Sequence, residues 1–239
     1  MEPISIIIPV YNEAENIEAL HTEIMEARSA YSSPFEIIFV DDGSLDNTAH
    51  ILKALSTSMP ALVYLSHKRN YGQSAAIISG VKKARYPWIV TLDGDGQNDP
   101  GDIECLLATL KKQPVKTVVF GNRHKRNDEW LRILSSRIGN RMRRALLNDD
   151  SSDTGCSLKL FPREAFLALP HFNHLHRFLP ALFKRAGFKI VNIAVHHRPR
   201  KHGVSKYGVR NRLWIGIFDL LGVYWLMKRP CEPEMSHFE

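Results

Sequence analysis

The sequence lacks several features that would place it in a special class of protein. Its three cysteines are odd in number and widely spaced, which implies no disulfide framework and favours a reducing compartment. It has no internal repeat and no low-complexity segment. The first residues lead directly into the apolar run Ile4–Ile8 without a basic region, so we expect a strand there rather than a signal peptide.

Long hydrophobic runs are also missing. The most apolar stretch, residues 213–227, is shorter than the roughly 20 apolar residues that a bilayer-spanning helix needs, and Asp219 interrupts it. Basic residues flank the stretch, and Trp214 and Trp225 lie within it, which is typical of a helix at a membrane surface. Packing against the protein's own core is the other interpretation.

The composition does contain an excess of positive charge. The 239 residues carry a net charge of +7 and are 44% hydrophobic, which fits one large domain or one domain with an extension. The charge indicates an anionic partner: nucleic acid, a membrane surface or a phosphorylated substrate. Because no basic and aromatic recognition motif accompanies the charge, nucleic acid is the least favoured of these partners.

Strand-like runs alternate with helix-like segments through the first half of the chain. The runs cover residues 4–9, 35–40, 61–66, 87–92 and 116–121. This alternation predicts an α/β fold with a mainly parallel, Rossmann-like sheet and helices on both of its faces.

Acidic clusters follow three of these runs: Tyr11-Asn12-Glu13, Asp41-Asp42-Gly43-Ser44 and Asp93-Gly94-Asp95. Parallel strands bring their carboxyl ends to one edge, where open α/β sheets bind ligands. The pair Asp93 and Asp95 has the chemistry to hold a hard cation against a diphosphate. The sequence therefore predicts a binding site at this edge.

Each cluster has another interpretation. For the second cluster, the alternative is that Asp42 and Ser44 merely form a turn and that Asp46 caps the next helix. Residues 93–99 nearly fit a calcium-binding EF-hand loop, but Asn98 stands where that loop needs glycine, and a strand precedes it instead of a helix. A phosphatase with an aspartyl nucleophile would also carry Asp-x-Asp-Gly, although on its first strand.

Two basic segments lie in the second half. Residues 130–147 combine apolar positions at helical spacing with many arginines, which predicts a helix that is either solvated or lies on anionic lipid. Residues 196–208 combine cations with glycines, and we expect this loop to close over phosphates. A zinc site built from its histidines is disfavoured, because acidic or cysteine partners at ligand spacing are missing.

Read in order, four motifs resemble those of family-2 glycosyltransferases. They are Ile8–Glu13, Val40–Ser44, Leu92–Gln97 and Asp153–Gly155. A fifth, Arg200–Lys206, is similar to the Arg-x-x-Gly-x-Ser-Lys motif of dolichol-phosphate mannose synthases and related bacterial polyprenyl-phosphate glycosyltransferases. The resemblance implies a GT-A glycosyltransferase domain over residues 1–210, with an apolar C-terminal extension over residues 211–239. The sequence departs from the commoner family pattern at Gly94, Gly96 and Cys156.

The resemblance also implies a role for each motif residue. The nucleoside of a nucleotide-sugar donor would be held by Pro9, Tyr11, Glu13, Val40 and Asp42. The donor diphosphate would lie with Mg²⁺ or Mn²⁺ at Asp93, Asp95 and Gln97, in a pocket lined by Gly94. The catalytic and phosphate-binding cations would be Arg123, Arg137, Arg200 and Lys206, with Asp153 on the acceptor side.

The implied reaction is inverting transfer of a hexose from GDP-mannose or a UDP-sugar to a dolichyl or undecaprenyl phosphate. A phosphate acceptor is largely ionised at neutral pH and needs no strong protein base. A saccharide acceptor is the alternative, and Asp153 would then have to act as base. We expect a peripheral protein on the cytoplasmic face of a membrane, with a membrane-protein partner left open. A catalytically inactive membrane-recruitment module is the rival from another class.

Overall fold

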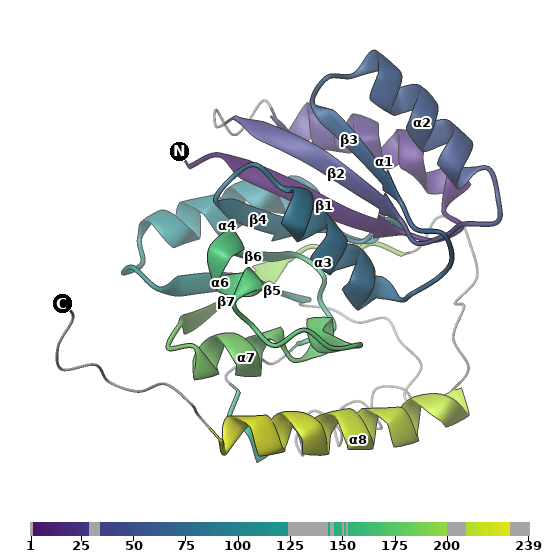
Figure 1. The fold of residues 1–239 in the computed structure, drawn as a ribbon. Helices are drawn as coiled ribbons and strands as arrows, with labels where there is room; N and C mark the ends of the chain where they lie inside the picture. Colours follow the sequence, from purple (N-terminus) through teal and green to yellow (C-terminus); the bar gives the residue numbers. More distant parts are fainter. Residues whose placement is uncertain are drawn as a thin grey trace, which may run out of the picture.

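A computed structural model describes residues 2–28, 34–123, 143, 146–149, 151, 153–199 and 209–229, and within the last range the side chains from residue 216 onward. The chain forms a central twisted sheet with helices packed on both faces, and a long C-terminal helix lies farther from the sheet (Figure 1).

The strands are β1 (Ile4–Val10), β2 (Phe35–Asp41), β3 (Leu62–Ser66), β4 (Trp88–Thr91), β5 (Thr117–Arg123), β6 (Lys159–Pro162) and β7 (Lys189–Val195). The helices are α1 (Ala14–Ala27), α2 (Thr48–Ser58), α3 (Gln73–Lys83), α4 (Asp102–Lys111), α6 (Arg163–Leu167), α7 (Leu179–Arg185) and α8 (Val209–Met227), with a short 3-10 helix, η2 (Leu175–Arg177). The five expected strand runs are confirmed as β1 to β5, with bounds close to those predicted.

The 7-stranded sheet has the order β3-β2-β1-β4-β6-β5-β7. Every pairing is parallel except those of β6, which runs antiparallel to β4 and to β5. Because β6 runs in the opposite direction, its first residue, Lys159, pairs with Thr91, the last residue of β4. The start of β6 therefore lies at the same edge as the end of β4.

Apolar residues on both faces of the strands explain the layered architecture. In β1, Ile6 and Ile8 pack with Ile17 of α1, whereas Ile7 packs on the opposite face with Ile77 of α3. Helices α1, α2 and α4 cover the first face, and α3, α6 and α7 cover the second. A sheet buried on both sides is what a parallel α/β fold requires.

The turns after β1 and β2 are tied directly to each other. The Asn12 N–H donates to Ser44 Oγ at 2.9 Å, and the Leu45 N–H donates to Asn12 Oδ1 at 2.7 Å. Gly43 has φ +74°, and a Cβ there would lie 2.4 Å from the carbonyl carbon of Arg69. Only glycine fits this position, and the first two acidic clusters meet at one edge as expected.

Helix α8 has one buried and one exposed apolar face. Val223 is fully packed into the core that α7 shares, with Tyr224 partly buried against it. On the other side, Phe218 is 70% exposed and Trp225 is 60% exposed. Core packing, one of the two interpretations of this stretch, thus holds for one face only. Within the ranges described, no helix combines the length and apolar character needed to cross a bilayer.

Candidate active site

The acid pair follows β4 directly. Gly94, between the two acids, packs tightly on β1: a Cβ there would lie 2.4 Å from Val10 Cγ1 and 3.3 Å from the Pro9 carbonyl oxygen. This close approach explains why glycine, and no larger residue, separates the acids here. The Asp95 carboxylate accepts the Gln97 N–H at 3.1 Å, which fixes the turn after the pair.

Asp93 is held from α3, across the sheet edge. Gln73, the first residue of α3, donates its side-chain N–H to Asp93 Oδ1 at 2.7 Å. Burial, together with repulsion from Asp95, raises the pKa of Asp93 to about 6, although Ser157 and Lys159 act in the opposite direction. Asp95 therefore lies close enough to disfavour the charged form of Asp93.

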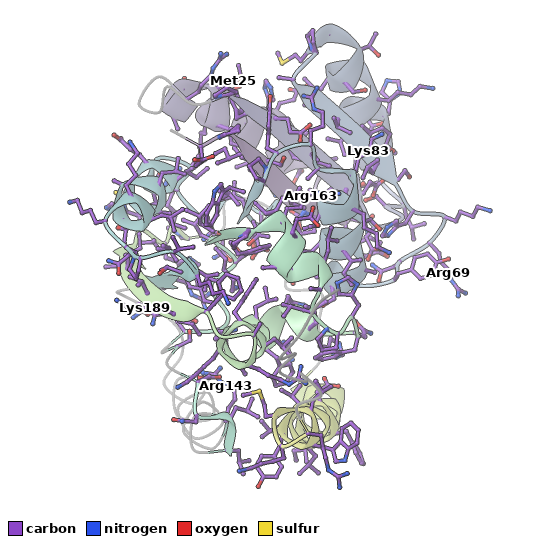
Figure 2. The ribbon with its side chains drawn as sticks, turned by 60° about the vertical axis from the view of Figure 1, so that its left-hand side comes forward. Met25, Arg69, Lys83, Arg143, Arg163 and Lys189 are labelled. Atoms are coloured by element: carbon purple, nitrogen blue, oxygen red, sulfur yellow. The ribbon has the colours of Figure 1, made fainter. Side chains whose placement is uncertain are left out.

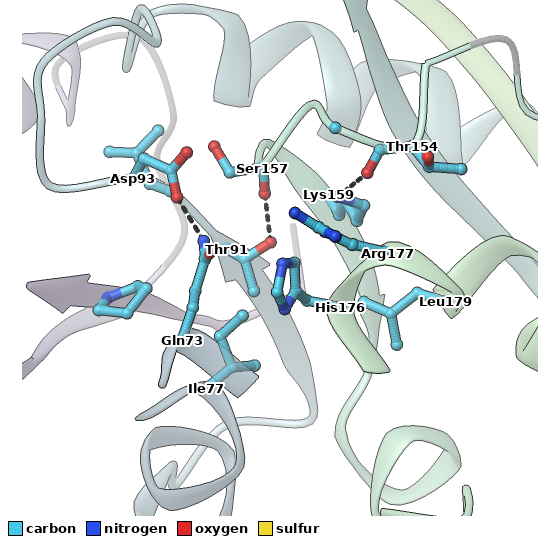
Figure 3. Close-up of a pocket in the computed structure, with 13 residues that line it drawn as sticks. Gln73, Ile77, Thr91, Asp93, Thr154, Ser157, Lys159, His176, Arg177 and Leu179 are labelled. Atoms are coloured by element: carbon cyan, nitrogen blue, oxygen red, sulfur yellow. Dashed lines mark hydrogen bonds between the residues drawn. The ribbon is translucent and has the colours of Figure 1, made fainter. Parts of the chain in front are cut away.

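A cavity of about 160 Å³ opens beside Asp93. We call it the inner cavity; its polar lining consists of Gln73, Thr91, Asp93, Thr154, Ser157, Lys159, His176 and Arg177. Figure 3 shows these side chains converging from α3, the end of β4, the start of β6 and η2. Within the described chain, Asp93 is the one acidic residue in this lining, and Lys159 and Arg177 are cationic.

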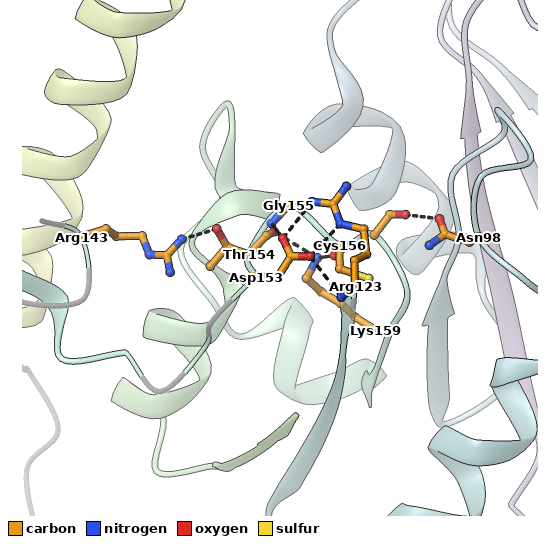
Figure 4. Close-up of polar contacts among 9 residues, drawn as sticks. Asn98, Arg123, Arg143, Asp153, Thr154, Gly155, Cys156 and Lys159 are labelled. Atoms are coloured by element: carbon orange, nitrogen blue, oxygen red, sulfur yellow. Dashed lines mark hydrogen bonds and ion pairs between the residues drawn. The ribbon is translucent and has the colours of Figure 1, made fainter. Parts of the chain in front are cut away.

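Lys159 is a buried cation at the start of β6. Only 4% of the residue is exposed, and its ammonium group donates to the carbonyl oxygens of Cys156 and, at 3.5 Å, Thr154 (Figure 4). Burial lowers the pKa of Lys159, while the neighbouring Asp93 raises it. Burial also raises the pKa of the Cys156 thiol, so this cysteine is not an activated nucleophile.

His176, which comes from η2, lines the inner cavity and is anchored to α3. Its Nδ1 lies 2.8 Å from Ser74 Oγ, and its backbone N–H donates to the same oxygen at 3.3 Å. Burial, followed by the charges of Arg177 and Lys159, holds the pKa of His176 well below its ordinary value of 6.5. The ring is therefore neutral at pH 7.

Arg123 and Asp153, both expected near the acceptor phosphate, form a bidentate ion pair. Arg123 Nε lies 2.6 Å from Asp153 Oδ2, and Nη2 lies 2.8 Å from Oδ1 (Figure 4). The pair is largely buried, with 14% and 8% of the two side chains exposed. A Cβ at Gly155 would lie 2.8 Å from Arg123 Nη2, so glycine at this position makes room for the guanidinium.

The acidic residues in the turn after β2 accept hydrogen bonds from different parts of the chain. Asp41 Oδ1 accepts the Ser44 N–H at 2.9 Å within the turn, and Asp46 Oδ1 accepts the Thr48 N–H at 3.0 Å just before α2, whose N-cap residue is Asn47 rather than Asp46. Asp42 instead accepts the backbone N–H groups of Tyr71 and Gly72, at 2.9 and 2.7 Å.

A second, larger cavity of about 380 Å³ lies along these turns. This outer cavity is lined by Tyr11, Asp41, Gly43, Ser44, Leu45, Ala49, Ser66, His67, Lys68, Arg69 and Asn70. The Arg69 side chain projects outward from the protein (Figure 2). His67 Nδ1 lies 2.7 Å from Asp42 Oδ1, which ties the wall of the cavity to β2.

The remaining residues expected at the nucleoside have different surroundings. Val40 is fully buried in the core next to α3, so its side chain packs rather than facing a cavity. The Glu13 carboxylate accepts the Asn16 side-chain N–H at 2.7 Å at the start of α1. Pro9 lines the inner cavity and Tyr11 the outer one, which places the two cavities on either side of the end of β1.

The first residues of the second basic segment are anchored beside the acid pair. The Arg198 N–H donates to the Gln97 carbonyl oxygen at 2.8 Å, and the Gln97 side-chain N–H donates to the Arg198 carbonyl oxygen at 3.3 Å. The Arg198 guanidinium bridges Asp99 at 2.6 Å and Glu23 at 2.7 Å. The chain that leads to Arg200 therefore begins next to the turn after β4.

Several expected residues lie outside the described part of the chain: Arg137, Arg200, Lys206 and most of the helix expected over residues 130–147. Arg143, which the helical pattern assigned to a solvated or lipid-facing surface, is instead buried. Its guanidinium pairs with Asp149, Nε to Oδ2 at 2.8 Å, and donates to the Ser151 carbonyl oxygen at 3.0 Å. A buried charge needs an ion-pair partner and hydrogen bonds, and Arg143 has both. The expectation was wrong at this residue because helical spacing does not reveal such partners.

Sequence reasoning missed four polar residues of the inner cavity: Gln73, Lys159, His176 and Arg177. Gln73 is the first residue of α3, and its hydrogen bond to Asp93 depends on how α3 packs at the sheet edge. The other three gave no local signal, because they approach Asp93 only through the antiparallel insertion of β6 and the placement of η2.

The acid pair fits a hard divalent cation. In the described residues no group of three or more His, Cys, Asp and Glu side chains has the arrangement of a metal site. Mg²⁺, however, is usually held by one or two carboxylates together with substrate phosphates. Burial, followed by repulsion from Asp95, raises the pKa of Asp93, and a cation bound at this carboxylate would offset both effects.

An α/β sheet that gathers paired carboxylates and polar cavities at the carboxyl ends of its parallel strands has the architecture of the GT-A glycosyltransferases. The sequence profile of glycosyl transferase family 2 matches residues 5–169. The chain belongs to this family, and it is a glycosyltransferase.

One relative and two solved structures are similar to the chain over nearly its whole length. Dodecaprenyl-phosphate galacturonate synthase of Rhizobium johnstonii is 33% identical over 238 residues, which cover 98% of this chain and 70% of that protein. Glucosyl-3-phosphoglycerate synthase of Mycobacterium tuberculosis, solved with Mg²⁺ and UDP, superposes with a TM-score of 0.70 at 16% identity, over 95% of this chain and 79% of that one. Mannosyl-3-phosphoglycerate synthase of Rubrobacter xylanophilus has a TM-score of 0.69 at 13% identity, over 98% and 79% of the two chains. At these identities the two structures are similar in fold alone.

Proposed function

We propose that this glycosyltransferase moves a sugar from a nucleotide sugar to a polyprenyl phosphate, with inversion at the anomeric carbon. The observation that carries the proposal is the acid pair Asp93 and Asp95, which follows β4 at the carboxyl edge of the sheet, with Asp93 in the wall of the inner cavity. The 33% identity to a dodecaprenyl-phosphate enzyme supports the acceptor. Mn²⁺ or Mg²⁺ with UDP in the structural relatives supports a divalent ion and favours a UDP-sugar over GDP-mannose as donor.

The two cavities suit the two ends of such a donor. The outer cavity is the larger one and has Tyr11 in its lining, which matches an aromatic nucleoside base. The inner cavity is smaller and polar, which matches a single sugar ring, and Asp93 in its wall would meet the diphosphate through the ion. Asp93, Asp95 and Gln97 would hold that ion, which as a Lewis acid neutralises the charge that develops on the leaving diphosphate.

The acceptor phosphate supplies its own nucleophile. A phosphate monoester has a second pKa of about 6 and is largely a dianion at neutral pH, so one of its oxygens can attack the anomeric carbon directly. What the protein must do is screen the repulsion between two anionic substrates. Arg123, Arg137, Arg200 and Lys206 remain our assignment for that role.

A saccharide acceptor is the second candidate, and the surroundings of Asp153 disfavour it. A hydroxyl nucleophile needs a base, and Asp153 would be that base. Both of its oxygens are instead engaged by the Arg123 guanidinium. Taking up a proton would break this buried ion pair, at a cost that a phosphate acceptor avoids.

We also propose that the protein works at the cytoplasmic surface of a membrane, with α8 as part of its contact. Phe218, Leu221 and Trp225 form an exposed apolar face, and Lys228 and Arg229 follow at its end. Such a face would insert among headgroups while the cations bind anionic lipid. Substituting Phe218 and Trp225 together by Ser should lower binding to anionic liposomes by sedimentation, whereas Leu45→Ser, also on an exposed apolar residue, should not.

The decisive experiment offers a panel of nucleotide sugars with polyprenyl phosphate and Mn²⁺, and detects lipid-linked sugar. Transfer that disappears with a chelator and returns with Mn²⁺ or Mg²⁺ supports the proposal. Hydrolysis of the donor without transfer, or transfer to a saccharide alone, contradicts it.

A further inference from the structure

We propose that Arg198 is a positioning residue for the divalent ion, because it orients the side chain of Gln97. The inference rests on the proposed function, which assigns the ion to Asp93, Asp95 and Gln97. In this role Arg198 touches neither the ion nor the donor, and it acts through Gln97.

The Gln97 side chain is held in one orientation by the backbone of Arg198. Its side-chain N–H donates to the Arg198 carbonyl oxygen at 3.3 Å, and the Gln97 carbonyl oxygen accepts the Arg198 N–H at 2.8 Å. A backbone carbonyl only accepts hydrogen bonds, so the amide presents its nitrogen to Arg198 and not its oxygen. The amide oxygen, which is the atom that binds a hard cation, is thereby directed away from Arg198 and kept for the ion.

The guanidinium of Arg198 fixes this stretch of backbone. Nη2 lies 2.6 Å from Asp99, two residues after Gln97, and Nη1 lies 2.7 Å from Glu23 on α1. The backbone pairing here is short, because Asn98 and the residue before Arg198 form an isolated antiparallel bridge outside the named strands. We infer that the two ion pairs are needed to hold the Arg198 carbonyl oxygen where Gln97 can donate to it.

Displacement of Gln97 would also reach the acid pair. The Gln97 N–H donates to the Asp95 carboxylate at 3.1 Å, so the two assigned ligands share one turn. Loss of a group that orients a metal ligand typically lowers metal affinity by about 10- to 100-fold. The ion pairs of Arg198 are partly exposed, with 34% of its side chain accessible, so their contribution to global stability is small. The expected effect of Arg198 is therefore on the ion and not on the fold.

The test measures Mn²⁺ binding directly, without sugar transfer. Electron paramagnetic resonance of the free ion gives the dissociation constant of Mn²⁺ with saturating UDP and, separately, with saturating GDP. We expect Arg198→Gln to raise this constant about 10-fold. Arg198→Lys should raise it about 3-fold, because one ammonium group replaces the forked donors that reach two acids. In transfer assays at saturating Mn²⁺, the kcat of both variants should stay within a factor of about two of the wild type.

A double variant distinguishes positioning from general destabilisation. Gln97→Ala removes the assigned ligand and should weaken Mn²⁺ binding at least as much as Arg198→Gln does. Because Arg198 acts through Gln97, combining the two substitutions should weaken binding no further than Gln97→Ala alone.

Arg85→Gln is the matched control. Arg85 Nε lies 2.9 Å from Glu36 Oε2, and Glu36 pairs with Ser5 near the amino ends of β1 and β2, at the edge opposite the acid pair. The variant also removes an arginine from an ion pair, and it should lower the melting temperature without changing the dissociation constant of Mn²⁺.

The outcomes separate the inference from the proposed function. If the wild type binds no Mn²⁺ with either nucleotide, both fail. If it binds Mn²⁺ but transfers no sugar to polyprenyl phosphate, the proposed acceptor fails, while the binding measurements still decide the role of Arg198.

The inference alone is overturned if Arg198→Gln binds Mn²⁺ as tightly as the wild type. It is also overturned if the effects of Arg198→Gln and Gln97→Ala add, or if kcat falls at saturating Mn²⁺, because Arg198 would then act on the substrates or the fold. Arg198→Lys provides the same comparison if Arg198→Gln does not fold.

Discussion

The inner and outer cavities flank the end of the same strand but are built differently. The inner cavity is enclosed by charged and polar side chains that arrive from α3, β4, β6 and η2, and Lys159 in its wall is buried. The outer cavity is formed by the turns after β1 and β2 and by residues 66–70, with Arg69 projecting outward. In the proposed function this difference corresponds to a division of labour: the bond would break beside the buried charges of the inner cavity, and the nucleoside would bind against the turns of the outer one.

The largest effect should come from the acid pair that borders the inner cavity. Asp95→Asn removes one carboxylate without adding bulk, and we expect it to lower turnover about 10³-fold at limiting Mn²⁺. The melting temperature should stay close to that of the wild type, because Asp95 is partly exposed. Glu104→Gln, on an exposed acid of α4, is the control and should retain full activity. Near-normal turnover of Asp95→Asn would reject the assignment of the ion.

A smaller effect of a different kind is expected in the outer cavity. Tyr11→Ala should raise the KM for the nucleotide sugar about 10-fold and leave kcat within a factor of about two, because stacking on a base contributes to binding more than to the transition state. Steady-state kinetics with varied donor measure both constants. A large fall in kcat with an unchanged KM would contradict the assignment of the outer cavity to binding of the nucleoside.

The smallest effect concerns stability and involves the neutral histidine of the inner cavity. Since its folded pKa lies well below 6.5, the unfolded chain binds a proton near pH 6.5 that folded His176 does not bind. The contribution of the neutral His176 ring to the free energy of unfolding is therefore fully present above pH 6.5. As the pH falls below 6.5, this contribution decreases by up to about 1.4 kcal/mol per pH unit.

His176→Gln should consequently flatten the loss of stability between pH 6.5 and 5, as measured by urea denaturation. A shallower slope remains, because burial also lowers the pKa of His21. His50→Gln, on the exposed surface of α2, should reproduce the wild-type slope. Equal slopes for wild type and His176→Gln would contradict a buried neutral ring.

The same contrast explains what could be predicted from sequence. The five strands, the parallel sheet and the meeting of the acidic clusters follow from local patterns, since Asp93 and Asp95 come directly after an apolar strand. Lys159 could not be placed, because its position beside Asp93 depends on β6 entering the sheet antiparallel between β4 and β5. Arg177 depends on a short 3-10 helix that has no periodicity to detect. Arg143 was misjudged because helical spacing describes faces and not ion-pair partners such as Asp149.

The antiparallel strand also has a consequence for the order in which the protein folds. During synthesis, β1 to β4 leave the ribosome first and can pair in the order β3-β2-β1-β4, with one side of β4 unpaired. This edge of β4 stays unpaired until β6 emerges, more than sixty residues later in the chain. Because Lys159 is the first residue of β6, the cation reaches Asp93 in the same step that closes the edge. The positive charge beside Asp93 and the end of aggregation risk at this edge should therefore appear together, late in folding.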